Sequence, residues 1–361
     1  MTQFEEKYNL LKRAKTPEDV FGSVKEFKID DVTKLFNKIV IHIHPDKCAS
    51  ENVEKANEAF LILMNFRTNA EQKIQDGTYG VTNPYEGVII STRKNKYKII
   101  NFLTEGDLCY IFKASDKNGL YVAIKIVKDI INNDLIDNEA TNLKYLYTDS
   151  PVKNFKIMDH ICPMPTDEFI YDDRGINRKG LVYPFIGGVV TIEDVINSYP
   201  NGIDTRDAAW MINRILGGLM APHQSDLVHG AIVPNNIFLD LPTHNGIILD
   251  WAFSVKKETP LKAISVKYKE YYPEEVFKKI PVNSGLDLYM VAKIFLKLVG
   301  GNLSTNTFPT TIPTNICGVF RACLLGKKQR TIDAYELHKD FSDALKANYG
   351  DRKFRKFELN R

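Results

Sequence analysis

The stretch Leu227-Val-His-Gly-Ala-Ile-Val-Pro-Asn-Asn-Ile-Phe-Leu-Asp240, followed shortly by Gly246-Ile-Ile-Leu-Asp-Trp-Ala252, decides the fold. Within this largely apolar sequence, the spacing of His229, Asn236 and Asp250 is the feature to explain. Ala231 lies two residues after the histidine and five before the asparagine. The interpretation of the remaining chain starts from the order and spacing of these four residues.

Composition places the chain among ordinary globular proteins. Of its 361 residues 44% are apolar and 26% are charged, and the formal net charge of +3 is too small to indicate nucleic acid or membrane as a partner. Its five cysteines are Cys48, Cys109, Cys162, Cys317 and Cys323. Their odd number, without a C-x-x-C pair, favours a reducing compartment over a disulfide framework or zinc site. With neither a signal-like N-terminus nor a membrane-length apolar run, we expect a soluble, cytoplasmic protein.

The stretch 227–252 resembles the catalytic loop and metal-binding turn of the eukaryotic-type protein kinases, H-R-D-x-x-x-x-N followed by D-F-G. His229 stands for the family's histidine. The resemblance implies Asn236 and Asp250 as magnesium ligands. The catalytic-base position holds Ala231, so no catalytic residue is assigned.

Upstream sequence extends this resemblance through a β-rich region with expected strands at 97–103, 109–114 and 121–127. The segment 103–111 aligns with the family's glycine-rich loop but keeps only Gly106 of its three glycines. Lys125, in Val-Ala-Ile-Lys, matches the phosphate-binding lysine, and Glu139 matches its partner on the following helix. The resemblance therefore implies nucleotide contacts from Gly106, Lys125 and Glu139, with ATP and Mg²⁺ as the implied ligands.

Downstream residues match structural positions of the same family, and the resemblance spans residues 97–345. The segment 180–185 resembles the strand and hinge between two lobes, and a helix is expected over 205–223. The resemblance implies that Asp287 braces the backbone of the catalytic loop. It also implies an ion pair between Glu274 and Arg330.

The departures from the family pattern favour a pseudokinase. Loss of a general base costs on the order of 10²–10⁴-fold in rate. Val233 also replaces the catalytic-loop lysine, and Trp251-Ala252 makes the metal-binding turn bulkier. The alternative is an active ATP-dependent transferase, either a kinase that relies on its substrate as base or a nucleotidyl transferase with a non-standard loop.

The first 76 residues predict a helical module. Thr16-Pro17 begins a helix, and Asp31 is expected to cap a second helix. Its apolar stripe consists of Val32, Leu35, Phe36, Ile39, Val40 and Ile43. Pro45 ends this helix, and a third helix is expected over 52–66, with Val53, Ala56, Phe60 and Leu63 facing inward.

The turn His44-Pro45-Asp46 between these two helices resembles a J-domain, with the match covering residues 19–75. In that family this turn and the basic face of the preceding helix engage the seventy-kilodalton heat-shock chaperone and trigger its ATP hydrolysis. The resemblance implies chaperone-binding roles for His44, Pro45, Asp46, Lys34 and Lys38. The alternative is a helical hairpin whose turn happens to contain His-Pro-Asp.

We therefore expect an α+β protein with a J-domain-like helical module (1–76), a linker (77–95), a bilobal kinase-like pseudokinase domain (96–346) and a basic tail (347–361). This arrangement resembles J-domain and kinase-like proteins of large tailed bacteriophages, which would place the chain in the host cytoplasm. The expected function is that of a co-chaperone whose body binds an unidentified client, or alternatively that of a pure scaffold. The tail, Asp351–Phe357, either binds an acidic partner or nucleic acid, or docks on its own domain through Phe354 and Phe357.

Overall fold

The computed structural model describes residues 2–14, 16–22, 27–45, 53–75, 79–80, 85, 87–153, 161–173 and 175–359. The chain forms two compact units. The first comprises Met1–Ile89 together with Tyr97–Thr104 and Ile111–Ser115. The second comprises Ile90–Lys96, Glu105–Tyr110 and Asp116–Arg361. No helix among the described residues is long and apolar enough to cross a membrane.

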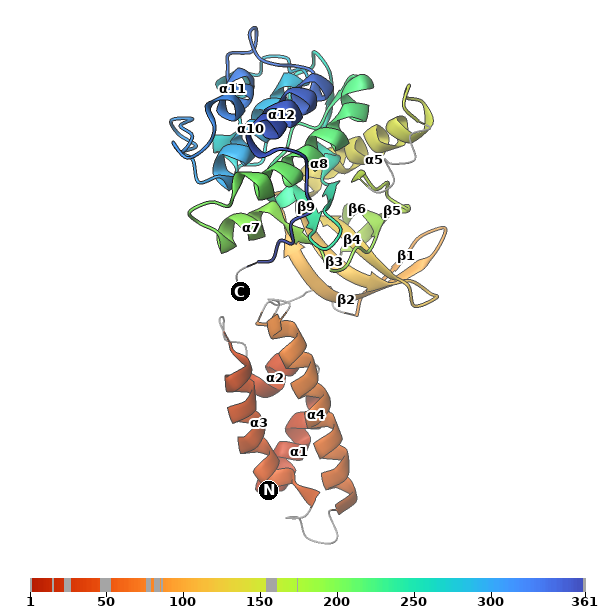
Figure 1. Cartoon of the computed structure of the whole chain (residues 1–361). Coiled ribbons are helices and arrows are strands. Elements are labelled where there is room, and N and C mark those ends of the chain that lie inside the picture. Colours follow the sequence, from red (N-terminus) through yellow and green to blue (C-terminus); the bar gives the residue numbers. More distant parts are fainter. Residues whose placement is uncertain are drawn as a thin grey trace. The chain divides into compact units, whose positions relative to one another are not determined.

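The N-terminal region of the first unit is helical, as the sequence predicts. Its helices are α1 (Gln3–Arg13), α2 (Pro17–Phe21), α3 (Ile29–Ile43) and α4 (Val53–Gln75). The helix α2 begins with a capping box between Thr16 and Asp19. The helices α3 and α4 run side by side in opposite directions (Figure 1), and the buried face of α3 is the predicted stripe.

Two details of these helices correct the sequence analysis. The expected cap Asp31 lies in the first turn of α3, which begins two residues earlier, and its carboxylate accepts the N–H of Lys28 at 3.2 Å. On α4 the inward face is formed by Ala56, Ala59, Leu63 and Ala70, whereas Val53 is exposed. The helix α4 also continues nine residues beyond Phe66, because Arg67–Glu71 and Lys73–Glu18 ion pairs and apolar contacts support its last turns.

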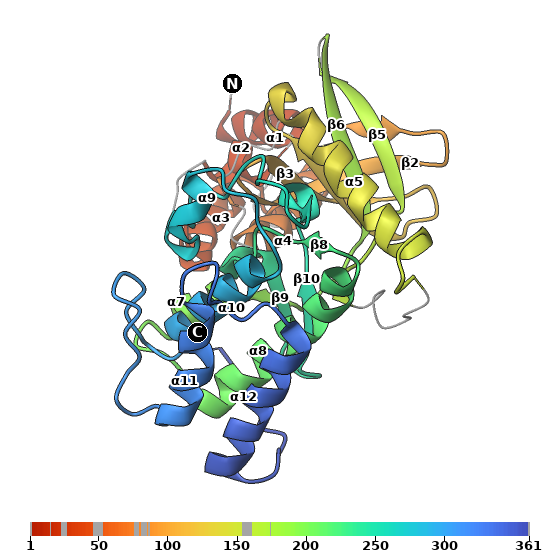
Figure 2. The same cartoon turned by 90° about the horizontal axis from the view of Figure 1, so that it is seen from above.

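One six-stranded sheet has the strand order β1-β2-β3-β4-β6-β5. Its strands are β1 (Ile89–Ser91), β2 (Lys96–Glu105), β3 (Cys109–Ser115), β4 (Tyr121–Val127), β5 (Asp167–Asp173) and β6 (Ile176–Pro184). The strand β1 falls inside the stretch expected to be a linker. The helix α5 (Asn133–Thr148) packs on β6 (Figure 2) and carries Glu139 near its middle.

The remainder of the second unit is mainly helical. Its helices are α7 (Ile192–Ser198), α8 (Thr205–Gln224), α9 (Glu274–Phe277), α10 (Gly285–Leu298), α11 (Thr314–Cys323) and α12 (Ala334–Tyr349). Short strands complete it: β7 (Val190–Thr191), β9 (Ile237–Asp240) and β10 (Asn245–Ile248) form one sheet, and β8 (Leu227–Val228) pairs with β11 (Val255–Lys256). The helix α8 lies at the centre, packed against α10 and α12 (Figure 2). This buried scaffold holds the loop that follows β8.

Candidate functional site

Three charged side chains converge where the sequence predicts nucleotide and metal contacts. Lys125 on β4 donates to Glu139 on α5 with an Nζ–Oε2 distance of 2.6 Å. The same ammonium group contacts the Asp250 carboxylate. Tyr183 on β6 donates its hydroxyl to the second oxygen of Glu139 at 2.7 Å. The structure thus brings the predicted pair together and joins it to the metal-binding turn.

Burial decides the electrostatics of this cluster, because Lys125 and Glu139 are 7% and 1% exposed. Burial by itself lowers the pKa of Lys125, but the charges of Asp250 and Glu139 more than offset it, so the pKa lies above its ordinary value. Burial also raises the pKa of the nearby Cys109 thiol to about 12. The site therefore presents a permanent cation beside a partly exposed carboxylate, a pair suited to phosphate and a divalent metal.

The loop after β8 is held by a buried carboxylate, as the sequence predicts. Asp287 on α10 accepts the backbone N–H groups of His229 and Gly230 at 2.8 and 2.9 Å. It also pairs with His223 Nε2 at 2.9 Å. Gly230 has φ +74°, and a Cβ there would lie 2.9 Å from the Phe253 carbonyl, so a side chain would strain the loop.

An apolar cluster occupies the surroundings of Ala231. Its buried members are Leu135, Ala231, Ala252 and Phe253. Leu108, from the segment that aligns with the glycine-rich loop, packs against them. A hydroxyl substrate and a transferred phosphoryl group both need polar partners, and these side chains supply none. Apolar side chains therefore surround the position that the resemblance assigns to the catalytic base.

A residue that follows the metal-binding turn contacts the segment that aligns with the glycine-rich loop. Ser265 is buried and donates its hydroxyl to the Asp107 carboxylate. The backbone N–H of Ser265 donates to the Tyr272 hydroxyl at 3.1 Å. Gly106 contributes to the tight loop through its N–H, which donates to the Cys109 carbonyl at 2.9 Å. That N–H, which the resemblance assigns to phosphate, thus bonds within the loop here.

Two asparagines on α5, which the sequence analysis missed, fix the metal-binding turn. Asn138 Nδ2 donates to the carbonyl oxygens of Ala252 and Ser254 at 3.1 and 2.7 Å. Asn142, one turn later, donates to the Ser254 hydroxyl oxygen at 2.9 Å. Two asparagines spaced i, i+4 beside Glu139 are the sequence signal from which these hydrogen bonds could have been predicted.

The bulky side chain of this turn is buried. The Trp251 indole is 1% exposed and packs edge-on against His229 with ring centroids 4.5 Å apart. The bulk that the sequence places in the turn therefore lies in the core. Asn236 is buried and donates its amide to the Ala231 carbonyl at 3.1 Å. Asn236 and Asp250 remain the residues that would hold a magnesium ion.

The expected Glu274–Arg330 ion pair is also wrong, by one residue. Arg330 Nη1 lies 2.7 Å from Glu275 Oε1, and both side chains are largely buried. Glu274 instead forms an exposed pair with Lys278 at 2.7 Å. At the start of the short helix α9, Glu274 faces solvent and the next residue, Glu275, faces inward.

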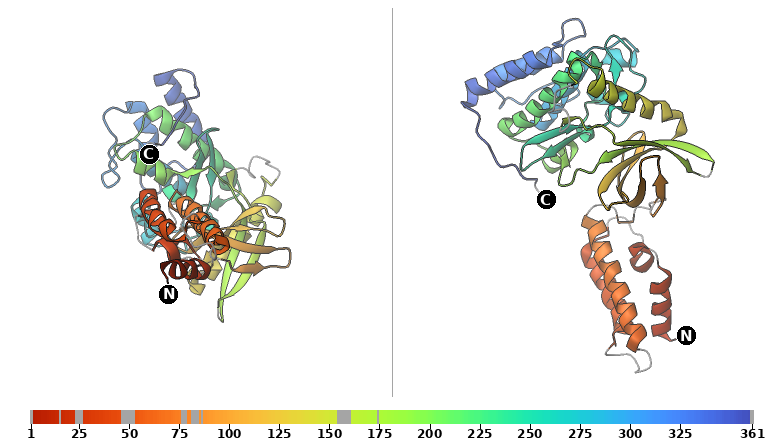
Figure 3. Two further views of the ribbon diagram at one scale, coloured as in Figure 1. Left: turned by 90° about the horizontal axis from the view of Figure 1, so that it is seen from below. Right: turned by 90° about the vertical axis from the view of Figure 1, so that its right-hand side faces the viewer.

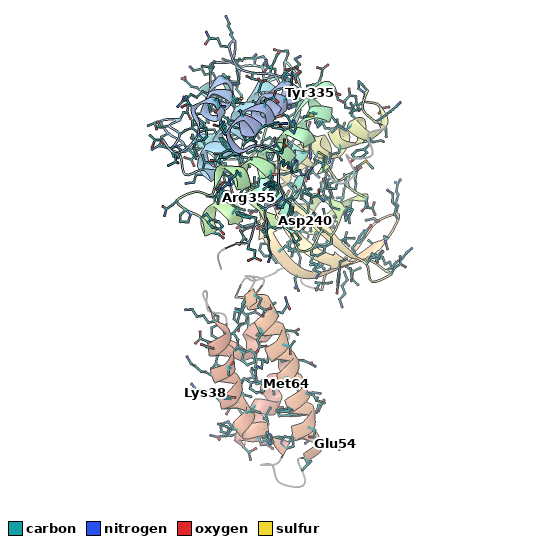
Figure 4. The ribbon with its side chains drawn as sticks, in the orientation of Figure 1. Lys38, Glu54, Met64, Asp240, Tyr335 and Arg355 are labelled. Carbon is teal, nitrogen blue, oxygen red and sulfur yellow. The ribbon has the colours of Figure 1, made fainter. Side chains whose placement is uncertain are left out.

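Of the predicted chaperone-binding residues, four lie among the described ones. Lys34 and Lys38 are exposed on α3, and Lys38 points away from the module (Figure 4). His44 ends α3 and packs edge-on against Phe60 of α4 at 5.8 Å. Pro45 follows it, and Asp46 lies outside the described residues.

A cavity of about 870 Å³ lies between α5 and the strands β5 and β6. Its lining includes Ile136, Lys144, Met164 and Phe169. The cavity does not include any of the predicted nucleotide or metal residues.

Comparison with solved structures shows a protein kinase-like fold. Vaccinia related kinase 3 aligns with a TM-score of 0.57 and 14% identity, over 74% of this chain and 93% of that one. The BubR1 kinase domain aligns with a TM-score of 0.54 and 16% identity, over 74% and 85%. No family model matches the chain.

Two curated proteins show weak sequence similarity to parts of the chain. Calcium-dependent protein kinase 4 of Plasmodium falciparum is 25% identical over 183 residues, which is 49% of this chain and 32% of that protein. Serine/threonine-protein kinase PkaB of Streptomyces coelicolor is 23% identical over 104 residues, 26% of this chain and 25% of that protein. The chain spans about a third or less of the length of these relatives. The helices before the sheet confirm the expected α+β class, and a kinase-like body is established.

Proposed function

We propose that the kinase-like body is a pseudokinase that serves as a binding scaffold. The apolar cluster that contains Ala231 carries this proposal, because Ala231 is fully buried among hydrocarbon side chains that offer no polar partner to a substrate hydroxyl. The bonds from Ser265 to Asp107 and from Asn138 to the metal-binding turn hold both sides of that cluster in place. Such a rigid site suits a scaffold better than a transferase, which must open and close around its substrates.

The intact charged cluster favours nucleotide as a ligand of this body. Lys125, Glu139 and Asp250 are already assembled, so magnesium-bound ATP would meet a preformed cation and a metal ligand. The bound nucleotide would stabilise the body by mass action without being consumed. Titration of ATP with and without Mg²⁺, followed by heating, tests this: a rise in melting temperature that Asp250→Ala abolishes supports it.

The same cluster supports a second candidate, an active transferase with a non-standard loop. A labelled-phosphate assay and a labelled-adenylate assay distinguish the two. Label on a protein that disappears with Asp250→Ala would overturn the pseudokinase proposal. Nucleotide binding without transfer supports it.

We propose further that the N-terminal module is a J-domain that stimulates a seventy-kilodalton heat-shock chaperone. Support comes from two packed helices with His44 and Pro45 at the end of the first, and from the exposed Lys34 and Lys38 on that helix. The body would then bring an unidentified client to the chaperone.

Single-turnover ATP hydrolysis by the cognate chaperone tests this role with the full chain. The wild-type protein should raise the rate, and His44→Gln should abolish the increase. His42→Gln, the same change two residues earlier on α3, is the matched control and should retain most of it. Absence of stimulation by the wild type would remove the co-chaperone proposal and leave the scaffold.

A further inference from the structure

Residues 352–359 lie in a groove on the kinase-like body. After α12 the chain turns at Gly350, with φ +76°, and residues 352–359 form neither helix nor strand (Figure 3). Phe357 is 8% exposed and packs against Tyr199, with ring centroids 5.6 Å apart. The Tyr199 hydroxyl donates to the Glu358 carbonyl at 2.6 Å. Of the two predicted roles of the tail, docking on its own domain is the one that the structure contains.

A carboxylate in this groove receives the central arginine of the tail. Arg355 donates through Nε and Nη2 to the two oxygens of Asp207 at 2.9 and 3.1 Å, and lies 3.8 Å from Asp204. Asp207 is 8% exposed on α8, so its charge is largely removed from water. Figure 4 shows Arg355 over this part of the body. A bidentate pair of this kind recognises the planar guanidinium, and lysine does not reproduce it.

Two aromatic contacts flank the arginine. Phe357 fills the apolar end of the groove beside Tyr199 and belongs to the main core. Phe354 stacks on His244 at 4.4 Å, and His244 in turn stacks on Trp210 at 4.1 Å. Phe354 is nevertheless 68% exposed. The groove therefore binds a short sequence pattern, aromatic–arginine–any residue–aromatic. The arginine and the second aromatic ring are its more deeply buried members.

The tail fits this groove incompletely. A cavity of about 500 Å³ lies between residues 356–359 and residues Tyr199, Gly202, Ile203, Asp204 and Asp207. Side chains, rather than a ladder of backbone bonds, provide the anchors named above, so the same contacts are open to a separate peptide. Because the tail is tethered to the body, it competes with a separate peptide for the groove at an effective concentration on the order of millimolar.

We propose that this groove is a docking site for a partner protein that carries an aromatic–arginine–x–aromatic segment, and that the chain's own tail is its resident occupant. The partner displaces the tail and gains the Asp207 pair and the apolar end of the groove. The site would supply the scaffold role proposed above with a specific class of partner. The test of this docking site measures neither chaperone stimulation nor nucleotide binding. Failure of this proposal can therefore be told apart from failure of the proposed function.

The probe is a fluorescent peptide with the sequence of residues 350–361 and Ala in place of Lys356, whose side chain is exposed. The receptor is the full chain with Arg355→Ala and Phe357→Ala in its own tail, which frees the groove. Fluorescence polarisation should show saturable binding to this chain. The wild type, with its tail docked, should bind at least about 10-fold more weakly. A peptide that lacks the arginine and the second aromatic ring should not bind.

Asp207→Asn in the freed chain should weaken binding by about 10-fold or more. Asp343→Asn, which changes an exposed carboxylate on α12, is the matched control and should have no effect. No binding to the freed chain, or equal binding after Asp207→Asn, overturns the proposal. If the wild type instead forms dimers that Arg355→Ala and Phe357→Ala abolish, the groove belongs to a second copy, and the proposal of a different partner is wrong.

A measurement on the wild type covers the case in which the freed chain does not fold. Excess unlabelled peptide should lower the fluorescence polarisation of a fluorophore attached to the C-terminus of the wild-type chain, because a displaced tail moves more freely than a docked one. Unchanged polarisation at saturating peptide would overturn the proposal.

Discussion

Arg330→Ala should destabilise the kinase-like body by about 3 kcal/mol. The Arg330 side chain is 3% exposed and its partner Glu275 is 16% exposed, so the truncation leaves a largely buried carboxylate without its cation. The change also removes the bond from Arg330 Nε to the Leu325 carbonyl, at 3.1 Å, and the contact with the Tyr289 ring. Because Glu275 keeps some contact with water, we take the lower end of the roughly 3–5 kcal/mol expected for a broken buried pair.

Tryptophan fluorescence during heating isolates the body, since the two tryptophans, Trp210 and Trp251, both belong to it. At about 2–4 °C per kcal/mol, the expected loss in melting temperature is roughly 6–12 °C. Glu275→Ala should give a similar loss. Glu274→Ala is the matched control, because solvent screens its exposed pair with Lys278 and this pair should contribute little to stability.

The combination of the two damaging changes provides the refutation. If Arg330 and Glu275 stabilise each other, the double variant should be markedly more stable than the sum of the single effects indicates. Equal effects of Glu274→Ala and Glu275→Ala, or a melt of Arg330→Ala indistinguishable from that of the wild type, would show that the pair is absent and that the assignment of α9 is wrong.

Three further changes test the site. Ala231→Asp should not create transfer activity, since the new carboxylate would be enclosed by the apolar cluster against which Leu108 packs; labelled phosphate on a substrate would refute this. Asn138→Ala removes both hydrogen bonds to the metal-binding turn. It should lower the melting temperature of the body and increase hydrogen exchange at Ser254. Unchanged exchange would show that these hydrogen bonds do not hold the turn. Burial lowers the pKa of His229, so the unfolded state binds a proton more readily below about pH 6.5 and stability present above that pH is lost on acidification. Denaturant unfolding should therefore show a lower free energy of unfolding at pH 5.5 than at pH 7.5, and this difference should shrink in His229→Gln.

Much of the fold could be predicted from periodic patterns. The stripe on α3 follows a helical period, and the strand with Lys125 is bounded in the structure as the sequence predicts, at Tyr121 and Val127. Glu139 falls on the inward face of a helix whose period is clear. In each case the pattern runs over several turns or a whole strand, so that burying one face fixes the direction of every side chain on it.

The same reasoning could not predict the details of short segments. The helix α9 has four residues, too few for a period to show which of two adjacent glutamates faces Arg330. The start of α3 moved from Asp31 because a carboxylate in the first turn and a carboxylate at the cap give similar sequence signals. The strand β1 has three residues and a largely exposed pattern, which gives little strand signal.

From the sequence alone, the kinase resemblance predicts that Ala231 stands at the catalytic-base position, because matching a motif needs only the order and spacing of residues. Only the tertiary structure decided what surrounds that alanine. Leu108, more than a hundred residues earlier in the sequence, packs against the cluster that contains Ala231. Ser265, which follows Ala231 in the sequence, donates its hydroxyl to Asp107 next to Leu108. The Trp251 ring likewise turned into the core, and the tail reached Asp207. These contacts join segments without internal periodicity, and their side chains are directed by the neighbours they meet after folding.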